Sequence, residues 1–247
     1  MCANNKQLIN TNWLVETFSM LVPEYIHFGF RIYNDALSGD DLKRFRLNIP
    51  LSKQEQKDIQ HVVVKREIEY RTGRALARRL LGLNRQDTHI SLHKNENGAP
   101  SWPAGSIGSI SHSASVCIVA MTSNKDFTGI GIDIEYGNFE PDFQDYILDG
   151  NESLDYSGEL SKLATLRRLF CCKEAIYKSM ERYLTEPVYF NDISVRFTKP
   201  VRNGIIEFEA MLNKNTAYKK IPHLASIQGS VYSDENMAMS IALLCPV

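Results

Sequence analysis

Residues 129–136 read Gly-Ile-Gly-Ile-Asp-Ile-Glu-Tyr and place the strongest constraint on how this chain can fold. An isoleucine at every second position predicts a β-strand with one buried face, because successive side chains of a strand point to opposite sides. Asp133 and Glu135 therefore share the other face. Their negative charges repel unless a cation lies between them, and carboxylate oxygens suit Mg²⁺. A solvated acidic face explains the pattern as well, so the strand alone leaves both interpretations open.

The same segment superficially resembles a dinucleotide-binding motif. Gly129 and Gly131 match the first two glycines of that motif, but Ile134 stands where the third is required. The alternating pattern also continues as a strand, whereas the motif opens a helix. We therefore reject dinucleotide binding.

The composition excludes several classes of protein. The 247 residues suffice for one large core or two small ones, and 28 basic against 29 acidic residues give no sign of a nucleic-acid partner. The sequence contains no apolar run near the roughly 18 residues of a membrane span, and its first residues lack the pattern of a signal peptide. Five cysteines without a Cys-x-x-Cys pair argue against a zinc site or a disulfide framework. We expect a cytoplasmic protein with no membrane span.

The first half predicts a strand over residues 24–33 and then a long helix. Residues 52–55, Ser-Lys-Gln-Glu, form a capping box, and the apolar stripe that follows ends near Gly82. Gly73 lies on this stripe, where a glycine costs about 1 kcal/mol relative to alanine. It is easier to explain if a backbone or a ligand approaches there. Among the many cations of this helix, we predict that Arg74 contacts a phosphate, because guanidinium groups match phosphate oxygens.

Residues 94–121 predict a loop and then strands. Residues 97–103 contain two prolines and a glycine and predict a turn, and Val116–Met121 predicts a buried strand. The Ser-His pair at Ser111 and His112 suggests a hydrolase, but neighbouring residues on a strand cannot pair as nucleophile and base. His112 as a ligand of phosphate and His112 as a structural residue both remain open.

The second half predicts a helix over about residues 160–183, followed by four strands at 193–197, 205–211, 226–232 and 237–244. Glu174 lies on the apolar stripe of this helix, between Phe170 and Tyr177. A buried carboxylate without a partner costs several kcal/mol or takes up a proton, so a metal ion or a close cation is expected there. Lys178, one turn further on, can share the site. A helix followed by strands in each half predicts an α+β fold with two similar lobes, residues 1–125 and 126–247.

Five segments together resemble the 4′-phosphopantetheinyl transferases of the large, monomeric surfactin/enterobactin-synthetase type. Residues 131–135 resemble the family's Gly-[Ile/Val]-Asp-x-Glu motif, and residues 170–178, Phe-Cys-Cys-Lys-Glu-Ala-Ile-Tyr-Lys, resemble its [Trp/Phe]-x-x-Lys-Glu-[Ala/Ser]-x-x-Lys motif. Residues 109–113 resemble its Ser-[Ile/Leu]-Ser-His-[Ser/Cys] segment. Residues 71–77 and 99–103 are similar to stretches of the enterobactin-synthetase component D branch. The segments follow the family's order over roughly residues 60–180.

This resemblance implies a pseudo-two-fold α+β fold, with a helix packed on a small antiparallel sheet in each lobe and coenzyme A between the lobes. It implies that Asp133, Glu135 and Glu174 hold Mg²⁺ against the pyrophosphate of coenzyme A. Glu174 would deprotonate a serine of an apo acyl or peptidyl carrier protein, and Lys178 would neutralise charge on the phosphates and on the leaving 3′,5′-ADP. Carriers of siderophore or secondary-metabolite biosynthesis are the expected partners, with the particular pathway left open.

The resemblance also implies that Ser111 and His112 contact phosphates and that Arg74 contacts the nucleotide. One position departs from the family, because Ala99 stands where many members carry a lysine near the adenine. Three residues could supply the missing charge: Arg74, Lys94 and Arg85.

Two other classes of function remain open from the sequence. One is a non-catalytic module that binds coenzyme A or a carrier protein, and the other is an α+β structural domain whose acidic strand is solvated. The presence of Asp133, Glu135, Glu174 and Lys178 together favours the enzyme.

Overall fold

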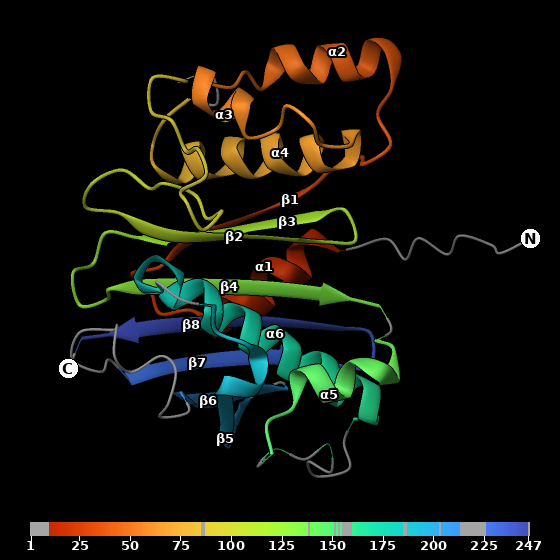
Figure 1. Cartoon of the computed structure of the whole chain (residues 1–247), viewed down its shortest axis with the longest axis vertical. Helices are drawn as coiled ribbons and strands as arrows, with labels where there is room; N and C mark the ends of the chain where they lie inside the picture. Colours follow the sequence, from red (N-terminus) through yellow and green to blue (C-terminus); the bar gives the residue numbers. More distant parts are fainter. Residues whose placement is uncertain are drawn as a thin grey trace, which may run out of the picture.

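The computed structural model describes residues 10–84, 87–137, 139–150, 152, 154, 160–184, 187–202, 204–212 and 226–246. Two antiparallel sheets carry the fold (Figure 1). The first has the order β1-β3-β2, with β1 (His27–Ile32), β2 (Ile107–Ser113) and β3 (Val116–Thr122). The second has the order β4-β8-β7-β6-β5, with β4 (Gly129–Tyr136), β5 (Ile193–Arg202), β6 (Ile205–Leu212), β7 (Ser226–Ser233) and β8 (Met237–Cys245). The predicted strands and the α+β class are confirmed.

Each sheet carries one long helix, α4 (Val64–Leu80) on the first and α6 (Lys162–Met180) across β4 and β8 of the second (Figure 1). The shorter helical segments are α1 (Thr11–Leu21), α2 (Gly39–Asn48), α3 (Lys53–Lys57), η1 (Pro141–Phe143), α5 (Gln144–Ile147), η2 (Glu181–Tyr183) and η3 (Phe190–Asp192). The two sheets differ in strand number. The predicted pseudo-two-fold relation and the predicted boundary between residues 125 and 126 therefore stay predictions.

Two findings bear on the class of protein. None of the helices in the described part of the chain combines the length and hydropathy needed to cross a lipid bilayer. The cysteines at 117, 171, 172 and 245 are free, and Cys2 lies outside the described residues.

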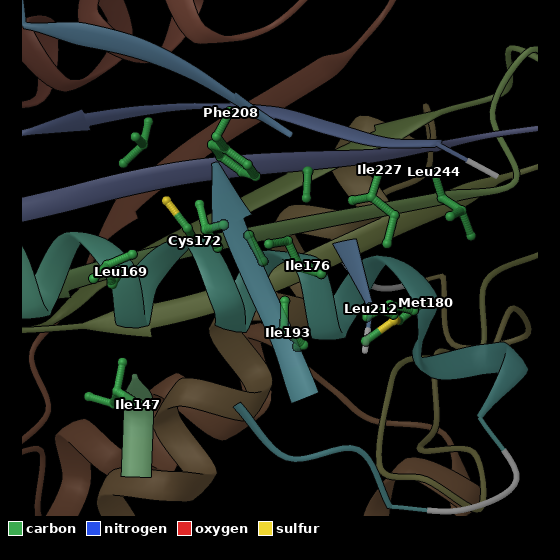
Figure 2. Close-up of a cluster of buried hydrophobic side chains, with 14 of the residues drawn as sticks. Ile147, Leu169, Cys172, Ile176, Met180, Ile193, Phe208, Leu212, Ile227 and Leu244 are labelled. Atoms are coloured by element: carbon green, nitrogen blue, oxygen red, sulfur yellow. The ribbon is translucent and has the colours of Figure 1, made fainter. Parts of the chain in front are cut away.

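Two hydrophobic cores lie on opposite faces of the second sheet. Ile130, Ile132 and Ile134 of β4 pack between the sheets against alternate residues of β3 and against α1. The other face of the sheet packs against Leu169, Cys172 and Ile176 of α6 (Figure 2). The predicted alternation of β4 is therefore confirmed, but its acidic face is covered by α6 instead of by solvent.

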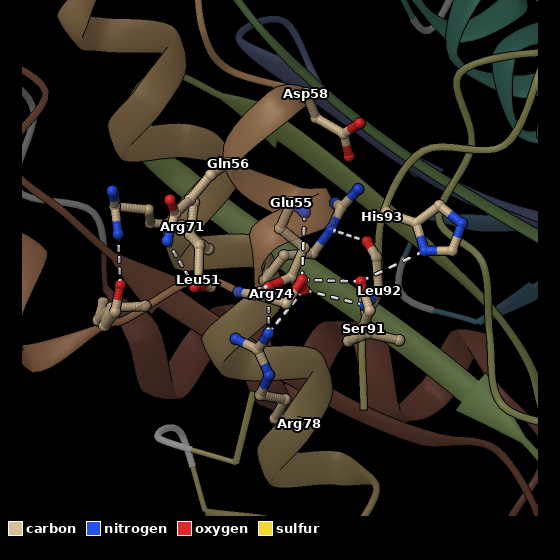
Figure 3. A network of polar contacts seen from close by, with 12 residues as sticks. Leu51, Glu55, Gln56, Asp58, Arg71, Arg74, Arg78, Ser91, Leu92 and His93 are labelled. Atoms are coloured by element: carbon tan, nitrogen blue, oxygen red, sulfur yellow. Dashed lines mark hydrogen bonds and ion pairs between the residues drawn. The ribbon is translucent and has the colours of Figure 1, made fainter. Parts of the chain in front are cut away.

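The single helix predicted from residue 52 to residue 82 is wrong, because the chain breaks it between α3 and α4. The capping box is present: Ser52 Oγ accepts from the Glu55 N–H (3.1 Å) and Glu55 Oε2 accepts from the Ser52 N–H (2.8 Å). The break falls after Asp58, where β-branched residues with low helix propensity cluster: Ile59, Val62 and Val63. It allows the fully buried Glu55 to form an ion pair with Arg78 of α4, at 2.5 Å (Figure 3).

Gly73 of α4 faces β2. A Cβ atom at Gly73 would lie 2.9 Å from Ile110 Cγ2 and 3.2 Å from His112 Nε2. Two side chains of the underlying strand therefore explain this glycine, and the backbone or ligand that the sequence suggested is not what approaches it.

The main chain of α6 lies directly on β4 at two glycines. A Cβ atom at Gly129 would stand 1.9 Å from Ser179 O, and one at Gly131 would stand 1.8 Å from Ala175 O. Real Cβ atoms do not come this close to a carbonyl oxygen, so only glycine allows this packing. The two glycines thus serve helix packing and not nucleotide binding.

We predict that Gly131→Ala lowers the free energy of unfolding by about 3 kcal/mol or more, because a rigid backbone must move to admit the methyl group. Urea denaturation measures this loss. Gly150→Ala is the matched control, because an added Cβ there meets no heavy atom within 4 Å and should change stability by less than about 0.5 kcal/mol. Equal stability of the two variants would contradict this account of the packing.

Candidate active site

Serine side chains of β2 join the two sheets. Ser109 Oγ accepts a hydrogen bond from the Ile132 N–H, and Ser113 Oγ accepts one from the Tyr136 N–H, both at 3.1 Å. β4 lies at an edge of the second sheet, where main-chain N–H groups need partners from outside the sheet. The serine hydroxyls supply these partners, so β2 and β4 lie side by side with their side chains in fixed register.

Four predicted site residues meet at this seam. Lys178 Nζ lies 2.6 Å from Asp133 Oδ1 and 3.6 Å from Glu174 Oε2. Ser111 Oγ donates to the same Asp133 Oδ1 at 2.7 Å. Asp133 is only 2% exposed, whereas the side chains of Glu174 and Lys178 are each 27% exposed. The structure therefore brings the motif of β4 and the motif of α6 together, with the helical residues open to ligand.

Glu135 adds a third carboxylate to the cluster of Asp133, Glu174 and Lys178, which then holds more negative than positive groups. Burial and the neighbouring Asp133 raise the pKa of Glu135 to about 8, although Lys178 opposes the shift. Burial also raises the pKa of Glu174. Asp133 Oδ2 is buried and has no hydrogen-bond partner. One lysine thus lies near three carboxyl groups, and this excess of negative charge favours the binding of a further cation.

The side chains alone do not form a closed metal site in this geometry. Within the described residues, no three His, Cys, Asp or Glu side chains are grouped closely enough to hold a metal ion. The carboxylate donors of Asp133, Glu135 and Glu174 nevertheless suit Mg²⁺, which binds oxygen ligands. The unpaired Asp133 Oδ2 and the raised pKa of Glu135 fit such an ion.

Ser111 and His112 point to opposite faces of β2. Ser111 faces Asp133, whereas His112 packs under α4, near Gly73 and at 6.3 Å from the ring of Tyr33. Burial lowers the pKa of His112 to about 3, so this histidine is neutral at physiological pH. The structure brings Ser111 but not His112 to the carboxylates, and the phosphate contact of His112 stays a prediction.

Arg74 is held by Leu92 and Tyr70. Its Nε donates to Leu92 O at 2.5 Å (Figure 3). Its guanidinium lies 4.0 Å above the ring of Tyr70. The residue is 4% exposed, and burial lowers its pKa. These contacts give Arg74 a structural role, and its predicted contact with the nucleotide stays a prediction.

A groove of about 780 Å³ opens beside Glu174 and Lys178. Its walls are the loop of residues 97–106, the connection between β3 and β4, and the end of α6 with η2; Glu174, Lys178 and Ala99 are among the lining residues. Three further cations line the groove: Arg66, Lys125 and Arg182. Of the residues considered as substitutes for a lysine at Ala99, Arg85 lies outside the described residues.

Sequence reasoning missed Lys125 and Arg182 as groove residues. Neither belongs to a motif or to an apolar stripe, and they reach the same groove only because the fold brings η2 to the β3–β4 connection, where Tyr183 OH donates to Thr128 O at 2.9 Å. A pattern along the chain carries no signal for such a pair.

Two family models and one known protein match this chain. A sequence model described as the 4′-phosphopantetheinyl transferase N-terminal domain matches residues 54–122, and one of the 4′-phosphopantetheinyl transferase superfamily matches residues 129–228. The 4′-phosphopantetheinyl transferase Npt of Nocardia iowensis is 35% identical over 97 residues, which cover 36% of this chain and 41% of that protein. The match thus spans less than half of this relative's length.

We predict that, in protein freed of metal by a chelator, Glu135 makes the free energy of unfolding fall as pH rises. A carboxyl whose folded-state pKa is raised to about 8 contributes stability at pH below its unfolded value near 4.5, and this contribution is lost as pH rises through 8. Relative to Glu135→Gln, the free energy of unfolding should therefore fall by roughly 1–3 kcal/mol between pH 5.5 and pH 8.5, as measured by urea denaturation.

Glu16→Gln is the control for that measurement, because Glu16 is exposed on α1. Its pH profile should follow that of the unchanged protein. Parallel profiles of the unchanged protein and Glu135→Gln would show that Glu135 is not perturbed.

Proposed function

Because this chain belongs to the 4′-phosphopantetheinyl transferase superfamily, we propose that it transfers 4′-phosphopantetheine from coenzyme A to a serine hydroxyl of an apo acyl or peptidyl carrier protein. The observation that carries this proposal is the meeting of Glu174 and Lys178, which line the groove, with the buried Asp133. We further propose that the protein acts in the cytoplasm as a monomer, with no nucleic-acid partner.

The groove suits an anionic nucleotide. Arg66, Lys125, Lys178 and Arg182 line it, and cations of this kind are the common partners of phosphate oxygens. We infer that the pyrophosphate of coenzyme A lies beside Lys178, since this lysine alone among the four also touches the carboxylate cluster. The remaining cations would then serve the other phosphate.

We propose that Asp133, Glu135 and Glu174 hold Mg²⁺. When bound, Mg²⁺ supplies positive charge to the phosphate oxygens. The carboxylates are buried with only one lysine among them, and burial together with repulsion from Asp133 raises the pKa of Glu135, so a bound cation would favour its ionised form.

Glu174 is the proposed proton acceptor. Its carboxylate lines the groove and remains 27% exposed, so a serine hydroxyl delivered to the groove can reach it. The serine Oγ would attack the phosphorus attached to pantetheine, its proton would pass to Glu174, and the bond to the second phosphate would break to release 3′,5′-ADP. The raised pKa of Glu174 makes it a better base, and Lys178 can neutralise the charge that gathers on the leaving phosphate.

We predict that Glu174→Gln lowers the transfer rate by about 10²–10⁴-fold, because the amide cannot accept the serine proton. Asp133→Ala should abolish transfer, because it removes the partner of both Lys178 and Ser111. The measurement is the mass gain of several apo carrier proteins incubated with coenzyme A, Mg²⁺ and each variant.

Asp142→Ala is the control for these variants, since Asp142 is an exposed acidic residue of η1. It should transfer at the unchanged rate. Full activity of either site variant would contradict the assigned roles. Binding of coenzyme A by the unchanged protein, with no mass gain on any carrier, would instead identify a non-catalytic coenzyme A or carrier-protein binding module.

We predict that Lys178→Ala lowers kcat more than it raises KM for coenzyme A, and that it moves the acid limb of the pH profile to higher pH. The lysine favours the ionised form of Glu174, so its removal raises the pKa of this base further. Steady-state kinetics between pH 5.5 and pH 9 would show both effects. A change confined to KM would make Lys178 a binding residue only.

A further inference from the structure

The hydroxyl of Ser113, at the end of β2, contacts two groups of β4 at once. Its Oγ accepts a hydrogen bond from the Tyr136 N–H at 3.1 Å and donates one to Glu135 Oε2 at 3.4 Å. The main-chain contact joins the two strands, and the side-chain contact limits the rotation of the Glu135 carboxylate. The proposed reaction does not yet use Ser113, although this hydroxyl touches one of the three proposed ligands of Mg²⁺.

Three serines of β2 face β4, and they make different contacts. Ser109 Oγ accepts from the Ile132 N–H at 3.1 Å, which is a contact with the main chain. Ser111 Oγ donates to Asp133 Oδ1 at 2.7 Å, which is a contact with a carboxylate. Ser113 makes one contact of each kind. A comparison of Ser109 with Ser113 therefore separates the joining of the strands from the orientation of a carboxylate.

The turn that follows Ser113 has an unusual backbone and fixes the end of β2. Ala114 and Ser115 have φ angles of 47° and 66°, in the left-handed region that residues other than glycine seldom occupy. Positive φ at both central residues gives the tight hairpin turn across which Ser113 pairs with Val116. The Tyr33 N–H braces this turn by donating to Ser115 O at 3.0 Å. Backbone strain of this kind persists only where the surrounding structure holds the chain, and it gathers at functional sites.

The Glu135 carboxylate gains more from such support than the Asp133 carboxylate does. A glutamate side chain has one more rotatable bond than an aspartate, so it loses more conformational freedom when a cation binds it. Asp133 is already held by Lys178 at 2.6 Å. Carboxylates that bind metal ions are themselves hydrogen-bonded by neighbouring residues, and loss of such a neighbour typically weakens metal binding by about 10–100-fold.

We propose, on the basis of the transferase function above, that Ser113 is a positioning residue that orients the Glu135 carboxylate for Mg²⁺. Ser113 acts through Glu135 and has no contact of its own with the reacting groups. If Ser113 served only to join β2 to β4, its loss would have the same effect as the loss of Ser109.

The test measures the affinity for Mg²⁺ by calorimetric titration of MgCl₂ into protein with excess coenzyme A. Ser113→Ala should weaken Mg²⁺ binding by about tenfold or more, because the carboxylate loses its hydrogen bond. Ser113→Thr keeps the hydroxyl and should keep the affinity for Mg²⁺. Ser109→Ala is the matched control, since it removes a main-chain contact of equal length and no contact with a carboxylate. It should keep the affinity for Mg²⁺, although urea denaturation should show that both alanine variants lose stability.

The inference is overturned if Ser113→Ala binds Mg²⁺ as tightly as the unchanged protein, or if Ser109→Ala and Ser113→Ala weaken Mg²⁺ binding equally. It is also overturned if Ser113→Thr binds as weakly as Ser113→Ala. Absence of Mg²⁺ binding by the unchanged protein removes the metal assignment and the role of Ser113 together. The mass gain of apo carrier proteins tests the transfer separately: if no carrier gains mass while the variants differ in Mg²⁺ affinity as expected, the proposed transfer fails and the role of Ser113 stands.

Discussion

The direct contact between the main chain of α6 and the glycine face of β4 is the constraint on which the site depends. Cβ atoms at Gly129 and Gly131 would overlap the carbonyl oxygens of Ser179 and Ala175. Because glycine has no Cβ atom, the helix lies directly on the strand with no side chain between them. Asp133 is the next residue on this face, and Lys178 of the helix therefore reaches it at 2.6 Å. The same alternation that buries three isoleucines on one side of β4 thus sets glycines and carboxylates on the other.

The two faces of β2 contact different elements, β4 on one side and α4 on the other. Its serines bind the edge of β4 and the Asp133 carboxylate, whereas Ile110 and His112 fill the space left by Gly73 of α4. Short polar side chains therefore fix the two sheets to each other at this seam. The loop of residues 97–106 and the end of α6 with η2 line the groove beside the seam, and Asn97 Nδ2 joins them by donating to Glu181 O at 3.2 Å. The groove thus opens beside carboxylates whose positions the seam fixes.

The features that local periodicity controls were predictable from the sequence, and those that depend on distant partners were not. Alternation predicted β4, and the four-residue spacing of Glu174 and Lys178 predicted that they share a site. The break between α3 and α4 was missed because the capping box and the apolar stripe continue across it, and the pairing of Glu55 with Arg78 becomes visible only in the folded chain. The carbonyl of Leu92 and the ring of Tyr70, which hold Arg74, likewise carry no signal at Arg74 itself.

The charge imbalance of the site has a cost that the surrounding fold must offset. A carboxyl whose pKa is raised to about 8, such as that of Glu135, is mostly protonated at neutral pH, and this uptake of a proton, which the unfolded chain does not share, lowers the free energy of unfolding relative to acidic pH. Such a group persists only where neighbouring packing is strong. β4 meets this condition, because its isoleucines are 0–2% exposed and its other face carries α6 without a gap. Stability that the core supplies thus offsets the cost of burying Asp133, Glu135 and Glu174 near a single lysine, and the proposed cation would return part of it.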